Sequence, residues 1–221
     1  MVLAVPAGSR EVKVSRMGRP TAAASKLLHE RVLCAARAVF LEMGFERASM
    51  ERVCEVADVA KATLYRKFPD KFSLLKAVLM APDLMRALPE VRPGKGESFT
   101  DTLARLAHDL LEWTLDRDLL GVARLSVETR AIRDEDMEAD ARRRADAVCR
   151  LVEEAFRLER PCLTFSEAGF YSRTFVNLIV QPRYIDAMEG RRNSEYTTSD
   201  QVETRRLVEF FIQGWNGTLL G

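Results

Sequence analysis

The stretch from Met50 to Leu75, MERVCEVADVAKATLYRKFPDKFSLL, constrains the fold more than any other part of the chain. Its first half carries apolar residues at the i, i+3, i+6 and i+7 spacing of one helix face: Met50, Val53, Val56 and Ala57. Four residues after Val56 a second short helix is expected near Ala60, with Leu64 and Phe68 on its inner side. This helix would present polar and basic residues outward: Lys61, Thr63, Arg66 and Lys67. The pattern predicts two short helices joined by a tight turn, the arrangement of a helix-turn-helix.

Charge is distributed unevenly along the 221 residues, although the net charge is only +1. Residues 1–80 hold 14 Lys and Arg against 8 Asp and Glu, a net +6, whereas residues 81–221 hold 20 against 25, a net −5. Only the first third is therefore suited to approach a polyanion. With the basic second helix, this predicts binding of double-stranded DNA through the major groove.

The segment Val59-Ala-Lys-Ala-Thr-Leu-Tyr-Arg-Lys-Phe68, with Asp70-Lys71 and Leu74-Leu75 after it, resembles the recognition region of the TetR family of one-component transcriptional regulators. The resemblance extends upstream through Ala35-Ala36, Phe40, Gly44-Phe45 and Ser49-Met50, and so covers roughly residues 26–80. It implies an all-α fold of about nine helices, with a helix-turn-helix domain followed by a helical bundle for ligand binding and dimerisation. We expect a disordered basic arm at 1–24, the DNA-binding domain at 25–80 and the bundle at 81–221.

Several DNA contacts follow from the resemblance. Lys61 and Thr63 would reach base edges or the adjacent backbone, while phosphates would be contacted by Ser49, Tyr65, Lys67 and Lys71. Arg66 is selected on chemistry alone, because its guanidinium fork matches the O6 and N7 atoms of guanine. The alternative for this set is a solvated basic helix face, and capping of the first short helix alone would explain Ser49.

The sequence departs from the family pattern in four places. Asp58 replaces a Gly of the turn, Ala60 a capping Ser, Ala62 a common Gly and Lys67 a common His. The first three changes affect the fine geometry of contact and not the fold.

The arm contains Arg16-Met-Gly-Arg-Pro20, which resembles the Gly-Arg-Pro core of minor-groove hooks. Arg19 would lie in a narrow minor groove, where the negative potential is enhanced. A disordered tail with generic affinity for phosphate is the equal alternative. Because family members often begin near such a motif, Met17 is an alternative natural start.

Outside the two short helices, apolar periodicity predicts helices and no strands. They are expected over residues 26–43, 71–88, 100–115, 119–132, 134–158, 165–188 with an interruption at Pro182, and 202–219. Gly44 should end the first of these, and Pro82 would end or kink the second.

The last two of these helices are apolar over more than one narrow stripe, so each needs two partners. By resemblance, the second partner is the same helix pair of another subunit, which predicts an isologous homodimer. The candidate interface residues are Phe170, Val176, Ile179, Leu207, Phe210, Phe211 and Trp215. A helix pair fully enclosed within one monomer is the alternative.

The resemblance also implies a pocket for a small-molecule effector among the middle helices. Its candidate lining residues are His108, Trp113, Arg124, Glu128, Phe156, Tyr171, Phe175 and Asn177. Arg124 and Glu128 have the i, i+4 spacing of a simple ion pair, and aromatic residues at helical spacing are usually core. The mixture of residues weakly favours a hydrophobic effector.

These observations predict a ligand-responsive transcriptional regulator, a dimeric repressor that binds a palindromic operator and is released by its effector. An activator and an effector-independent architectural protein are the alternatives. An enzyme is not expected, since no catalytic motif or Cys–His couple is found. The scattered Cys34, Cys54, Cys149 and Cys162, with only two histidines, predict neither a metal site nor a cofactor. No apolar run reaches the length of a membrane span and no secretory signal is found, so we expect a cytoplasmic protein associated with the bacterial nucleoid.

Overall fold

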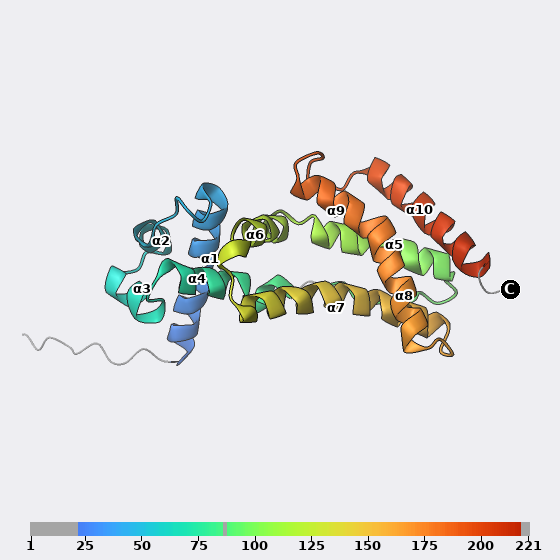
Figure 1. Cartoon of the computed structure of the whole chain (residues 1–221), viewed down its shortest axis with the longest axis horizontal. Helices are drawn as coiled ribbons and strands as arrows, with labels where there is room; N and C mark the ends of the chain where they lie inside the picture. Colours follow the sequence, from blue (N-terminus) through green and yellow to red (C-terminus); the bar gives the residue numbers. More distant parts are fainter. Residues whose placement is uncertain (1–21, 86–87, 218–221) are drawn as a thin grey trace, which may run out of the picture.

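The computed structural model describes residues 22–85 and 88–217, and every regular element in these ranges is helical. Four helices form an N-terminal head: α1 (Ala22–Met43), α2 (Met50–Ala57), α3 (Lys61–Lys67) and α4 (Lys71–Leu79). The short 3-10 helix η1 (Pro82–Met85) leads from the head toward the body. The head occupies one end of the molecule and the body the other (Figure 1). The predicted all-α fold is therefore confirmed.

The body is a bundle in which α7 runs along most of its length (Figure 1). Its elements are α5 (Phe99–Thr114), α6 (Arg117–Glu128), the 3-10 helix η2 (Arg130–Ile132), α7 (Glu135–Glu159), α8 (Phe165–Phe175), the π-helical turn η3 (Val176–Val180), α9 (Gln181–Met188) and α10 (Thr198–Gly217). Since α8, η3 and α9 follow one another without a break, they form one continuous helix. The described helices thus agree with the expected number of about nine.

Local sequence sets the ends of the head helices. Gly44 has φ +75°, a conformation that costs glycine little, and its amide closes α1 by donating to the carbonyl of Phe40. Ser49 caps α2 by accepting from the backbone N–H of Arg52. Asp70 and Ser73 form a reciprocal capping box at α4. Each of these signals lies within a few residues of the end it fixes.

The core of the head is completed by the body. Phe40, Leu64 and Leu74 are fully buried in it, and Val122 of α6 and Met137 of α7 belong to the same cluster. A Cβ atom on Gly121 would lie 2.9 Å from a methyl carbon of Leu41, so α6 approaches α1 as closely as a glycine permits. The division that we expected near residue 80 therefore cuts through a shared core.

Polar contacts also join head and body. The Glu128 carboxylate accepts from the backbone N–H of Phe45 at 3.1 Å. Lys76 contacts Asp134 at 2.6 Å, and Arg144 of α7 donates to the carbonyl of Leu79 at 2.6 Å. The C-terminal end of α4 is therefore held by the N-terminal half of α7.

An aromatic cluster forms the centre of the body. Phe156 of α7 is fully buried, with ring centroids 5.4 Å from Phe99, 5.5 Å from Trp215 and 5.9 Å from Phe211. These rings come from α5, α7 and α10, so the cluster fastens three helices distant in sequence. No helix in the described ranges is long and apolar enough to span a membrane.

Two helices end earlier than the sequence predicts, and a third continues through a proline that was expected to interrupt it. The helix expected over 71–88 ends at Leu79, because Pro82 cannot continue it. That expected over 119–132 ends at Glu128 and tightens into η2. Pro182 does not interrupt the helix over 165–188, because the preceding turn widens, with the amide of Gln181 bonded to the carbonyl of Val176, five residues back.

Candidate nucleic-acid interface and ligand cavity

The turn between α2 and α3 depends on one strained residue. Asp58 has φ 50°, the only positive φ at a described residue other than glycine. Asp tolerates this region better than most residues, and the guanidinium of Arg31 donates to its carbonyl at 3.4 Å. Asp58 therefore supplies the conformation for which the family pattern uses a glycine. Ala60 begins α3 without a side-chain cap, as the missing hydroxyl requires.

The second helix of the motif is held by its inner side and open on its outer side. Leu64 is fully buried against α1, α2 and α4, and Phe68 is buried just beyond α3. Lys61, Tyr65 and Arg66 are exposed, whereas Thr63 is half-buried. The ammonium of Lys61 lies 3.4 Å from the Glu51 carboxylate, and the pKa of Glu51 is lowered by a hydrogen bond from its own backbone and then by the one from Lys61.

Two lysines expected at phosphates are used inside the head. Lys71 donates to the carbonyls of Phe45, Glu46 and Ala48 at 2.8, 3.0 and 3.1 Å, which occupies all three of its donors. Lys67 donates to the carbonyl of Ser25 at 3.1 Å. These bonds fix the connection between α1 and α2 and tie the end of α3 to α1. Sequence spacing gave no sign of them, because their acceptors are backbone atoms over 20 residues away.

The remaining expected contacts divide into two groups. Ser49 is exposed while its hydroxyl caps α2, so its structural role is present whether or not it meets phosphate. Arg19 and residues 1–21 of the expected arm lie outside the described residues.

Burial divides the candidate dimer residues. Phe170 of α8 and Phe210 of α10 are 60% and 68% exposed. Leu207 is half-buried, and four others are packed into the body core: Val176, Ile179, Phe211 and Trp215. These four cannot contact another subunit without repacking, because they already fill the inner side of their own helices.

The candidate ligand residues are dispersed. Phe156, Tyr171 and Phe175 belong to the aromatic core, and Asn177 is exposed on the continuous helix. The ring of His108 contacts that of Tyr196 in a tilted arrangement, with centroids 5.2 Å apart. Arg124 and Glu128 do not pair with each other as their spacing suggested. Arg124 donates to the carbonyl of Ala187 at 2.5 Å, while Glu128 holds the amide of Phe45. Of the eight candidates, Trp113 alone lines the cavity described next.

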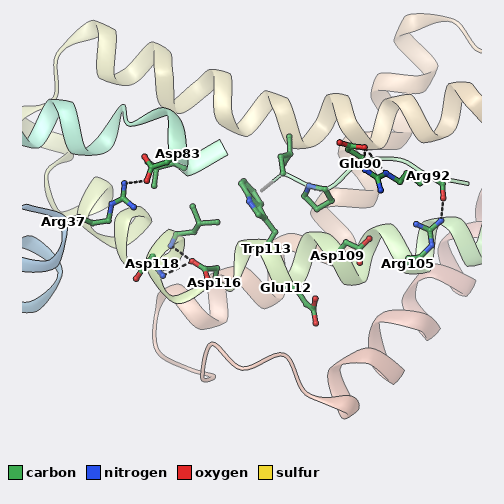
Figure 2. A pocket seen from close by; sticks show the side chains of 14 residues that line it. Arg37, Asp83, Glu90, Arg92, Arg105, Asp109, Glu112, Trp113, Asp116 and Asp118 are labelled. Carbon is green, nitrogen blue, oxygen red and sulfur yellow. Dashed lines mark hydrogen bonds and ion pairs between the residues drawn. The ribbon is translucent and has the colours of Figure 1, made fainter. Parts of the chain in front are cut away.

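This cavity, of about 830 Å³, lies where the head meets the body. Its lining comes from α1, η1, residues 88–92, α5 and the start of α6: Arg37, Asp83, Leu84, Leu88, Pro89, Glu90, Arg92, Arg105, Asp109, Glu112, Trp113, Asp116, Asp118 and Leu119. In Figure 2, Arg105 and Trp113 project from one side of α5 and Glu112 from the other. The spacing of Arg105, Asp109 and Trp113 at i, i+4 and i+8 was the sequence signal for a mixed polar and aromatic face on α5.

Charge in the cavity wall is mostly negative. Six carboxylates and three guanidinium groups line it, and each guanidinium is already paired. Arg37 contacts Asp83 at 2.8 Å, Arg92 contacts Glu90 at 2.6 Å, and Arg105 contacts Glu97 at 2.8 Å. Hydrogen bonds from Arg105 and then from the Gly94 amide lower the pKa of Glu97 to about 2. The sequence weakly favoured a hydrophobic effector, which would need a mostly apolar cavity. The wall of this cavity is instead rich in acidic side chains.

The fold and these two sites define a helix-turn-helix protein with a helical body and a cavity between them. Residues 32–78 match the family model described as bacterial regulatory proteins, tetR family. This match lies within the head and identifies a helix-turn-helix of the TetR type there, as the recognition region suggested.

Known relatives are similar to this chain in part of the sequence, and solved structures are similar to it in fold. The HTH-type transcriptional regulator UidR of Escherichia coli K12 is 37% identical over 84 residues, which are 36% of this chain and 42% of UidR. The match thus covers less than half of that relative's length. A TetR transcriptional regulator from Agrobacterium tumefaciens shares the fold with a TM-score of 0.66 at 22% identity, over 85% of this chain and 93% of that one. The flavonoid-responsive regulator FrrA does so with a TM-score of 0.64 at 23% identity, over 86% of this chain and 97% of its own.

Proposed function

We propose that this chain is a ligand-responsive transcriptional repressor that binds a palindromic operator as a homodimer. The observation that carries the proposal is the exposed face of α3, with Lys61, Tyr65 and Arg66 on a helix whose inner side is buried in the head. A helix held in this way enters the major groove without rearranging the domain.

In this proposal the contacts have different tasks. Arg66 reads a guanine, Lys61 and Tyr65 contact phosphate or base edges, and Ser49 meets phosphate with the N-terminal end of α2. Lys67 and Lys71 act indirectly, by fixing the segments that carry these residues, because their donors are used internally. Thr63, which is half-buried, and Arg19 remain proposed contacts of the groove edge and the minor groove.

A second subunit is proposed on the outer side of α8 and α10. Phe170 and Phe210 are large apolar side chains left exposed there. An isologous contact through both helices would bury all four rings of two subunits and place two copies of α3 on one side of the dimer. Two successive major grooves are about 34–36 Å apart, so the half-sites of the operator should have that spacing.

Release by a small molecule is proposed through the cavity at the junction of head and body. Arg37 belongs to α1 and Asp83 to η1, so the cavity wall includes the head itself. A ligand that prefers one arrangement of this wall would change operator affinity by its differential binding. The shared fold with a flavonoid-responsive regulator supports control by a small molecule, without indicating which one.

The test is binding to DNA upstream of the protein's own gene, with nonspecific competitor and a salt series. We expect competitor-resistant binding and a footprint with two-fold symmetry. Arg66→Ala should relax the choice of base, whereas Lys61→Ala should weaken binding to all duplexes. If both variants bind the operator like the parent, α3 is not the reading helix. Weak, salt-sensitive binding to every duplex would count against a specific regulator.

A further inference from the structure

We infer that the cavity between head and body takes an organic cation with an apolar body. The inference rests on the proposed function, in which this cavity is the effector site, and it names the chemical class of that effector. At about 830 Å³ the cavity has the size of sites that enclose a drug-sized molecule.

Charge is the first argument. The three guanidinium groups of the wall are each neutralised by a carboxylate within 3 Å. Four lining carboxylates form no ion pair with these guanidinium groups, although Arg105 interacts electrostatically with the first of them: Asp109, Glu112, Asp116 and Asp118. Asp116 caps α6, and Glu112 lies 3.4 Å from His108, which leaves the carboxylates of Asp109 and Asp118 without an ion pair or hydrogen bond among the described residues. A cationic ligand would gain attraction here, and an anionic ligand would be repelled.

Trp113 is the second argument. It follows Asp109 by one helical turn on α5 and also lines the cavity. Its indole N–H is shielded from solvent and has no acceptor within reach among the described residues. A buried donor without an acceptor is unfavourable, so a ligand that carries an acceptor would satisfy it. An indole ring also attracts cations over its face within about 6 Å of the centroid.

The apolar part of the wall is the third argument. Leu84, Leu88, Pro89 and Leu119 line the same cavity. A bare metal ion would leave this surface without a partner, whereas an organic cation would cover it while placing its charge near Asp109. Charge and an apolar body in one molecule would match the wall, and an acceptor on the same molecule would add a hydrogen bond from Trp113.

Binding of two ions of the same shape and opposite charge tests the inference. Tetraphenylphosphonium and tetraphenylborate would each be titrated into the full-length protein, without DNA, by isothermal titration calorimetry. We expect one phosphonium per chain and at least tenfold weaker binding of the borate. Asp109→Asn should weaken the phosphonium about tenfold, as expected from Coulomb's law for about 6 Å at an effective dielectric constant of about 40.

Asp146→Asn is the matched control. It removes the same charge from an exposed position of α7 that does not line the cavity, and it should leave phosphonium binding unchanged. Borate binding as tight as phosphonium binding, no binding of the phosphonium, or equal effects of the two Asn variants would each overturn the inference. Because no DNA is present, these results leave the operator experiment intact, and a failure of operator binding leaves this titration intact.

Discussion

Replacement of Lys71 by Ala separates a structural role from a DNA contact. The variant removes three hydrogen bonds to backbone carbonyls, at 2.8–3.1 Å, and a cation–π contact at 4.5 Å from the Phe45 ring centroid. Hydrogen bonds to charged groups contribute roughly 1.5–3 kcal/mol each when buried, but water can reach part of this site. A loss of about 2 kcal/mol is therefore expected. For a chain of this size, that corresponds to a fall in Tm of about 4–8 °C.

The assay combines thermal unfolding with the salt dependence of operator binding. If Lys71 supports the segment between α1 and α2 without touching phosphate, Lys71→Ala weakens binding but leaves the slope of log K against log salt unchanged. Lys61→Ala is the matched control, since Lys61 is exposed on α3. It should lower the slope by about 0.9, the value for one phosphate contact, with little effect on Tm. The reverse pattern, an unchanged Tm and a lower slope for Lys71→Ala, would refute the structural role.

Three further predictions concern assembly and stability. Phe210→Asp should convert dimers to monomers in analytical ultracentrifugation, whereas Val127→Asp, at an exposed apolar position of α6, should not. Phe156→Ala should lower the free energy of unfolding by about 3–5 kcal/mol in a denaturant titration, because a fully buried ring is lost; a change below about 1 kcal/mol would contradict the assigned core. Because the pKa of Glu97 is lowered to about 2, its ionised form stabilises the fold above its ordinary pKa of 4.5, and this contribution is lost as the pH falls through 2. The Tm of Glu97→Gln should therefore depend less on pH between 4.5 and 2, and equal slopes for variant and parent would refute this.

The sequence predicts the structure of the head well wherever the residue that sets a helix end or a turn lies within a few positions of it. Ser49 caps the helix that follows it, Gly44 ends the one before it, and Asp58 takes the left-handed conformation of the turn. Each assignment needs only a few adjacent residues and a known backbone preference. The exposed side of α3 is predictable in the same way, because a seven-residue helix with Leu64 inside has only one arrangement of its other side chains.

The body was less predictable, because burial there depends on partners distant in sequence. Val176, Ile179, Phe211 and Trp215 lie on broad apolar helices, and periodicity cannot tell which side meets the monomer core and which is left exposed. The cavity was missed for a similar reason. Its acidic and basic residues come from five segments, and each is an ordinary surface residue in the sequence.

The same long-range contacts explain how a ligand in the cavity between head and body would influence α3, the proposed reading helix. Arg37 lines the cavity and contacts Asp83, while Arg31, six residues earlier on α1, donates to the carbonyl of Asp58 in the turn before α3. Because α1 is a single helix packed closely against α6 at Gly121, a displacement at the cavity end would move the turn as well. Packed interfaces change between discrete arrangements and do not deform continuously. Effector control therefore requires only that the ligand favour one arrangement of α1 against α6, and the side chains between cavity and DNA need no separate relay.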